Sequence, residues 1–265
     1  MNEETATQNE QNHCACCGQP VADNVELCSV CEAQLDFTLH EPIEGREEIE
    51  LEQGVKLRTE LVNLAELPQA FTMDQGFLYL NWEPVNALIN GKVAEPEQGR
   101  AWKDAVAQWM ERLAANLGED YVVRDSGRFV LVSCVSERRA NVLFQFSEQT
   151  LDAISEELGK AALMMGAGQY PIVAFADEEA YRRYLRHFYH TEQTVADTEG
   201  FCIGEGYVHI ALPPRNLQQL KRTLAHELTH ATTAHLPLNL VERGTCHEHR
   251  KGHRRRTSDL GRLQA

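Results

Sequence analysis

Two histidines and a glutamate in the C-terminal part of the chain have the types and the spacing of a metal centre. His226 and His230 are four residues apart, which places both imidazoles on one face of a helix. They can share one zinc ion, and Glu227 can deprotonate a water on that ion while the metal polarises a carbonyl oxygen. The HExxH pattern therefore predicts zinc-dependent hydrolysis, although roughly a few per cent of chains of this length would contain it by chance.

The residues before the motif predict the helix that must position it. Asn216 can cap a helix that begins at the next residue. Four leucines recur on one face of that helix, nearly opposite the histidines. They are Leu217, Leu220, Leu224 and Leu228.

The N-terminal region contains a second group of metal-ligating residues. Two Cys-x-x-Cys pairs are separated by ten residues, and four thiolates at this spacing suit one tetrahedral zinc ion. They are Cys14, Cys17, Cys28 and Cys31. His13 and Cys16 are alternative ligands in the first pair. Residues 13–35 resemble a zinc ribbon, and a segment this short is expected to need its metal for folding.

Composition and charge limit the classes of partner. The 265 residues are 43% hydrophobic and carry 40 acidic against 25 basic side chains, a net charge of −15. This charge opposes nucleic acid and anionic lipid as partners of the whole surface. No apolar run approaches the ~20 residues that span a bilayer, and the cysteines are clustered as in metal sites rather than disulfides. We therefore expect a cytoplasmic protein that does not bind membranes.

The chain between the two metal motifs predicts a mixture of helices and strands. The expected elements are a helix over 102–117, a hairpin over 121–134, a helix from 136 to 158, a buried strand over 170–175 and a helix over 177–189. Residues 200–212 indicate a further hairpin or an edge strand. The predicted class is α+β, a zincin-like domain with a mixed sheet and an HExxH helix, plus a small N-terminal zinc ribbon.

Composition also divides the chain into five segments. Residues 1–12 are a polar, disordered tail, and the zinc ribbon follows over 13–35. Residues 36–120 contain a linker and a helical or mixed region. The catalytic-type domain is expected over 121–240, and a basic tail over 241–265.

Over about Tyr121 to Leu238, the sequence resembles the gluzincin metallopeptidases, specifically the short peptidase-MA-like domains. The resemblance rests on the HExxH motif, on Ala231, on His235-Leu236-Pro237 and on the order of elements upstream. It implies His226 and His230 as zinc ligands and Glu227 as the general base. It also implies a strand that grips the backbone of a peptide substrate. The candidates for that strand are Gly206, Tyr207, Val208, His209 and Ile210.

The chain departs from this family after the HExxH helix. A second helix there opens with Trp-Leu-x-Glu-Gly-x-Ala, whose Glu is the third zinc ligand. Here the chain contains no Trp in this region, and Glu242 is the nearest substitute ligand. Residues 243–265 carry seven basic against two acidic side chains, a charge of +5 that leaves −20 on the rest of the chain.

One cause would explain both the lost motif and the change of charge. Codons compatible with the chain after Leu240, read one base later, encode Trp-Leu-Asn-Glu-Gly-Leu-Ala-Met, which contains the missing motif. We therefore expect the segment 241–265 to be frameshifted and disordered. The alternatives are a genuine basic tail that contacts nucleic acid, or an extra metal site from His247, His249 and His253.

Two function classes follow from these patterns. The first is a zinc metallopeptidase-like protein with one structural and one catalytic zinc, impaired by the loss of the third-ligand helix, with a peptide or protein as substrate. The second is a non-catalytic zinc-binding or adaptor protein whose HExxH helix is vestigial. A nucleic-acid binder that uses the ribbon and the basic tail is disfavoured by the charge of −20 elsewhere.

Overall fold

A mixed five-stranded sheet forms the centre of the protein. The structure is a computed structural model that describes residues 13–14, 19–22, 25, 27–34, 48–50, 56–58, 61–159, 169–189 and 199–234. The strand order is β5-β6-β7-β9-β8, in which β6, β7 and β9 are parallel and the outer strands β5 and β8 are antiparallel to their neighbours. The strands are β5 Val122–Asp125, β6 Phe129–Ser133, β7 Tyr170–Ala174, β8 Phe201–Ile203 and β9 His209–Leu212.

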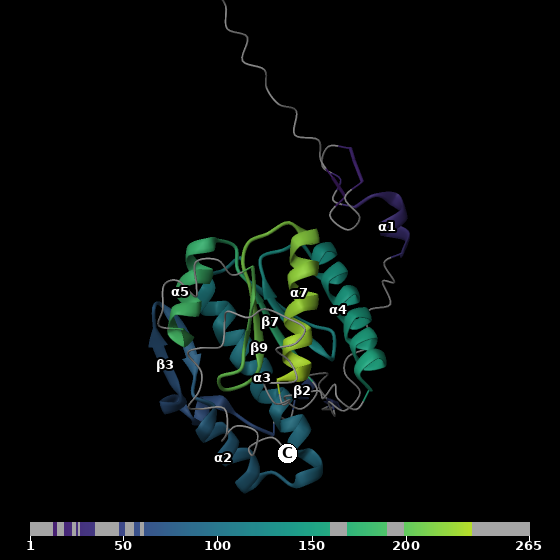
Figure 1. The fold of residues 1–265 in the computed structure, drawn as a ribbon. Coiled ribbons are helices and arrows are strands. Elements are labelled where there is room, and N and C mark those ends of the chain that lie inside the picture. Colours follow the sequence, from purple (N-terminus) through teal and green to yellow (C-terminus); the bar gives the residue numbers. More distant parts are fainter. Residues whose placement is uncertain are drawn as a thin grey trace, which may run out of the picture.

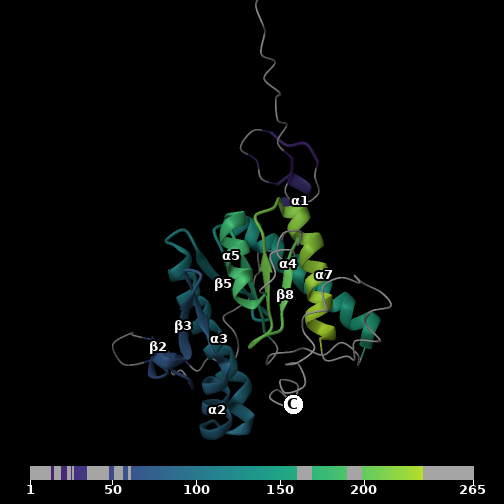
Figure 2. The same ribbon diagram turned by 60° about the vertical axis from the view of Figure 1, so that its left-hand side comes forward.

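Helices cover both faces of this sheet (Figures 1 and 2). One face packs against α4 and α7, which lie side by side, and the other face packs against α3 and α5. Their bounds are α3 Glu95–Leu117, α4 Glu137–Leu158, α5 Glu178–Phe188 and α7 Leu217–Thr233. Because side chains alternate along a strand, Leu131 of β6 joins the core of the first face while Val130 and Val132 join that of the second. The predicted α+β combination of helices with a mixed sheet is confirmed.

The segment before the sheet contributes to the same core. Its described residues include the antiparallel pair β1–β2, two 3-10 turns, a helix and the hairpin β3–β4, which packs on α3. These elements are β1 Glu48–Glu50, β2 Lys56–Arg58, η1 Leu64–Glu66, η2 Pro68–Ala70, β3 Phe71–Asp74, β4 Phe77–Leu80 and α2 Trp82–Lys92. The Trp82 ring lies 5.2 Å from that of Trp109 on α3 and 5.1 Å from that of Tyr207 beside β9, measured between centroids. The region over 61–117 and the sheet are therefore packed as one unit.

Several predicted elements are confirmed. The hairpin over 121–134 is β5–β6, Ser136 caps α4, Asp177 caps α5, and residues 200–212 form the β8–β9 hairpin. The helix predicted from residue 102 begins earlier, at Glu95, because Pro96 is suited to a first helical turn. Within the described ranges, no helix combines the length and the apolar character that crossing a bilayer requires.

The contact between α7 and β8 generates a prediction about Gly200. A Cβ atom at this position would lie 2.1 Å from Cγ2 of Thr223 on α7, so replacement by alanine forces the helix away from the strand. We expect Gly200→Ala to lower the free energy of unfolding by about 1–3 kcal/mol in urea denaturation, the usual cost of overpacking. Gly99→Ala is the matched control, because a Cβ there meets nothing within 4 Å and alanine favours the helix α3. Equal stability of the Gly200→Ala variant and the parent protein would contradict the close packing.

Candidate metal centres

The helix α7 begins and is oriented as its sequence predicts. The Asn216 side chain accepts from the main-chain N–H of Gln219 at 2.9 Å, and the Gln219 side chain accepts from the N–H of Asn216, which completes a capping box. Its leucines are buried against α4 and the sheet. The opposite face therefore carries His226 and His230, which are both partly exposed.

The two histidines are arranged as a pair of ligands for one ion. Their Nε2 atoms lie 3.0 Å apart and their ring planes are inclined by 85°. A tetrahedral zinc with Zn–N bonds of about 2.0–2.1 Å separates two such nitrogens by about 3.3 Å, so a small rotation of the rings accommodates the ion. In the described part of the chain, no further His, Cys, Asp or Glu joins this pair at ligand distance. Glu242 lies outside the described residues.

Glu227 is buried between α7 and the edge strand β8. Only 6% of its surface is exposed, and the main-chain N–H of Cys202 donates to its carboxylate. Burial raises the pKa of Glu227 from 4.5 to about 7, because a charged carboxylate is poorly solvated there, and the Cys202 hydrogen bond opposes this shift. A carboxyl group with a pKa near neutral can both accept and release a proton at physiological pH.

The residues predicted to grip the backbone of a substrate do not lie at an exposed edge of the sheet. His209 and Ile210 belong to β9, which is paired with β7 on one side and β8 on the other. Tyr207 and Val208 are buried, and Gly206 lies in the turn before them, against Trp82. His209 and Ile210 are therefore not part of an edge strand, because both sides of β9 are already paired. The sheet edge beside α7 is β8.

His209 is a core residue and not a ligand. Its Nδ1 lies 2.8 Å from the carbonyl oxygen of Tyr207, which can only accept, so Nδ1 carries the proton and Nε2 accepts from the Tyr184 hydroxyl at 2.9 Å. Burial lowers the pKa of His209 to about 4, because the charged ring is poorly solvated, and the hydrogen bond to Tyr207 opposes this shift. The ring is neutral at pH 7.

Residues of the β8 region that the sequence did not single out also shape this centre. The Tyr189 ring packs at 4.1 Å from that of Phe201, measured between centroids. Burial raises the pKa of Tyr189, and the charges of Cys202, Glu205 and Glu227 add to the shift, so the hydroxyl stays protonated. An aromatic residue at a helix end carries no signal in the sequence that could have identified this position.

Three of the four predicted ribbon cysteines come together. The sulfur atoms of Cys14, Cys28 and Cys31 lie within 4.8 Å of one another, and the N–H of Cys28 donates to Sγ of Cys14 at 3.2 Å. The short helix α1 Ser29–Gln34 positions the last of them. Leu27 is fully buried in the core that contains α4 and α7, so the ribbon packs on the domain (Figure 2). Such a set of thiols suits a tetrahedral metal that takes sulfur ligands, and Cys17 lies outside the described residues.

Comparison with known proteins provides no relative for these centres. No family model, curated protein or solved structure matches the chain. The interpretation of both centres therefore depends on the residues and the geometry described above.

The buried His209 generates a prediction about pH. In the unfolded chain its pKa returns to about 6.5, so the unfolded state binds more protons between pH 6.5 and 4, and stability falls as the pH decreases through this window. Between pH 7.5 and 4.5 this residue should account for a loss of about 2–3 kcal/mol in the free energy of unfolding. Glutamine does not titrate, so the free energy of unfolding of His209→Gln should fall by about 2–3 kcal/mol less than that of the parent protein between the two pH values, as measured by urea denaturation. Identical pH dependence of the two proteins would contradict it.

The cysteine cluster generates a prediction about metal binding. Cobalt added to the metal-free chain should produce the thiolate charge-transfer absorption of four sulfur ligands. Replacement of Cys14, Cys17, Cys28 or Cys31 by serine should reduce this absorption by one ligand each. Cys16→Ser is the matched control and should leave it unchanged. A spectrum with fewer than four thiolates in the parent chain, or an equal loss in the Cys16→Ser variant, would reject the proposed ligand set.

Proposed function

We propose that this chain is a zinc metallopeptidase-like protein of the gluzincin type that hydrolyses peptide bonds and is impaired in its present form. The observation that carries the proposal is the pair of Nε2 atoms 3.0 Å apart on α7, with the buried Glu227 between them in sequence. A zincin-like arrangement also fits the mixed sheet, whose edge strand β8 lies against the same helix.

The donor set fits zinc, since imidazole nitrogens are ligands that this ion prefers. His226 and His230 would hold the ion, which would supply a Lewis acid for the substrate carbonyl and lower the pKa of a water molecule. Glu227 acts as the base: its carboxylate takes a proton and later returns it to the leaving amine.

The impairment follows from the number of ligands. Catalytic zinc has three protein ligands as a rule, and two histidines leave the ion exchangeable and the attacking water poorly oriented. In this proposal the third ligand is the Glu of the sequence Trp-Leu-Asn-Glu-Gly, which the alternative reading frame would encode after Leu240. Glu242 is the substitute that the present sequence offers.

The ribbon has a structural part in this proposal. Cys14, Cys28 and Cys31, completed by Cys17, would hold a second zinc that stabilises the ribbon on α4 and α7. The described cysteines are not paired in disulfides, which fits the cytoplasmic location that we propose. We propose a peptide or protein as the partner and neither nucleic acid nor membrane.

One observation favours the alternative, a non-catalytic zinc-binding or adaptor protein with a vestigial HExxH helix. The Glu227 carboxylate already has a structural role, because it accepts from the main chain of Cys202 and joins α7 to β8. A buried glutamate can be retained for such a contact alone. The two functions differ in whether removing the carboxylate abolishes hydrolysis.

The proposal is tested by assaying casein or mixed-peptide cleavage with added zinc. The chain as given and a version restored to the alternative frame after Leu240 are compared, each with its Glu227→Gln variant as background. Glutamine retains an oxygen for the Cys202 N–H and removes a buried group that is costly to ionise, so we expect this variant to remain folded. We expect weak or no activity in the given chain and activity at least about tenfold higher in the restored one, because misplacement of the reacting groups costs orders of magnitude.

Two outcomes would count against this account. Equal activity of both chains above the Glu227→Gln background would show that the missing ligand is unimportant. No activity above background in the restored chain, with zinc still bound, would favour the adaptor protein.

A further inference from the structure

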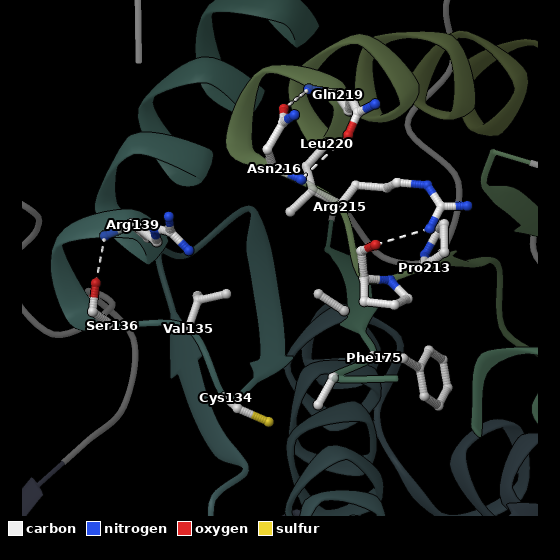
Figure 3. Close-up of a pocket in the computed structure, with 13 residues that line it drawn as sticks. Cys134, Val135, Ser136, Arg139, Phe175, Pro213, Arg215, Asn216, Gln219 and Leu220 are labelled. Atoms are coloured by element: carbon white, nitrogen blue, oxygen red, sulfur yellow. Dashed lines mark hydrogen bonds between the residues drawn. The ribbon is translucent and has the colours of Figure 1, made fainter. Parts of the chain in front are cut away.

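A cavity of about 580 Å³ opens at the opposite end of α7 from the histidines. It lies where the three parallel strands β6, β7 and β9 end, between the N-termini of α4 and α7. Its walls come from three connections between a strand and the next helix, and Figure 3 shows the side chains. The lining residues are Cys134–Ser136, Arg139, Ala174–Ala176, Pro213–Asn216, Gln219 and Leu220. In open sheets of this kind, ligands bind outside the carboxyl ends of parallel strands.

The charge of the lining is opposite to that of the whole chain. Arg139 and Arg215 are its charged side chains, and neither Asp nor Glu contributes to the lining, although the chain has a net charge of −15. Arg139 belongs to the first turn of α4 and Arg215 precedes the cap of α7, so the two side chains begin on different sides of the cavity, and the Arg215 guanidinium group lies beside the Pro214 carbonyl group (Figure 3). The positive ends of the two helix dipoles point to the same space.

Two carboxylates at the start of α5 have partners of their own. Glu178 accepts from Arg215 Nη1 at 2.7 Å and also pairs with Arg182, and the Pro214 carbonyl oxygen accepts from the same Nη1 at 2.9 Å, so these contacts use two of the five N–H donors of Arg215. The Asp177 carboxylate caps α5 by accepting from the N–H of Ala180. Burial and the charges of Asp120 and Asp177 raise the pKa of the Cys134 thiol, which lies across the opening from Gln219 in Figure 3.

The cysteine in this cavity is not suited to be a nucleophile. Burial raises the pKa of Cys134, and the charges of Asp120 and Asp177 raise it further against the hydrogen bond from Tyr121. A protonated thiol is a weak nucleophile, so we do not propose nucleophilic catalysis in this cavity. The lining also includes the apolar side chains of Val135, Phe175 and Leu220, together with the polar side chains of Ser136, Asn216 and Gln219.

We propose that this cavity binds a phosphate monoester that carries an apolar group. The phosphate would lie between Arg139 and Arg215 at the two helix N-termini, because planar guanidinium groups bind phosphate oxygens in pairs. The apolar group would cover Val135 and Phe175. The cavity volume is within the range of sites for small organic ligands.

This site is separate from the proposed metal centre. Leu217, at the start of α7, and His226 are nine residues apart, which is about 14 Å along a helix. Binding in the cavity is therefore expected to be independent of zinc and of Glu227. The inference goes beyond the proposed function and does not depend on it.

The test is isothermal titration calorimetry of the full chain with phenyl phosphate, benzoate and phenol. We expect saturable binding in the order phenyl phosphate, benzoate, phenol, and Arg139→Gln and Arg215→Gln should each weaken phenyl phosphate by about ten- to a hundredfold. Arg186→Gln is the matched control, since this arginine of α5 is paired with Glu179 outside the cavity. Glu227→Gln should bind as the parent chain does.

A variant that is expected to bind phenyl phosphate more tightly shows that weaker binding in the arginine variants is not caused by unfolding. Glu178→Gln releases Arg215 from a competing carboxylate and should tighten phenyl phosphate binding severalfold. Four results would overturn the proposal: no saturable binding, tighter binding of benzoate than of phenyl phosphate, equal weakening by Arg186→Gln, or loss of binding in Glu227→Gln.

Discussion

The close contact between α7 and the edge strand β8 is the constraint on which the candidate catalytic centre depends. Gly200 allows Thr223 to approach the strand closely, and this contact buries Glu227 against the main chain of Cys202. The histidines lie further around the same helix, where they remain partly exposed. A more distant helix would return Glu227 to water and its pKa to the ordinary range.

Burial acts in opposite directions on two titratable groups of this fold. It raises the pKa of Glu227 on the α7 face of the sheet, and it lowers the pKa of His209, whose ring lies among the aromatic residues of the other face. Both groups are thereby driven toward their neutral forms. The difference lies in their surroundings, because His209 uses both ring nitrogens within the core while Glu227 lies beside a pair of potential metal ligands.

The local features of the fold could be predicted from the sequence, and the non-local ones could not. The capping of α7 by Asn216 and the two sheet hairpins depend on neighbouring residues, which periodicity and turn residues reveal. The placement of β9 inside the sheet depends on pairing with β7, which is distant in sequence, so the sequence alone could not show which strand of residues 200–212 lies at the edge. The hydrogen bond between Cys202 and Glu227 and the cavity between three loops depend on the same long-range arrangement.

The parallel pairing of β7 with β9 also has a consequence for the order in which the chain folds. It joins Ile172 to Ile210, so the intervening chain with α5 must be closed into a loop before this part of the sheet forms. The antiparallel β8–β9 pair is local and can form early, but it reaches the sheet only through β9. Contacts between distant segments form slowly. We therefore expect β8 and α7 to meet late in folding, so His226, Glu227 and His230 reach their final arrangement only in an almost finished domain.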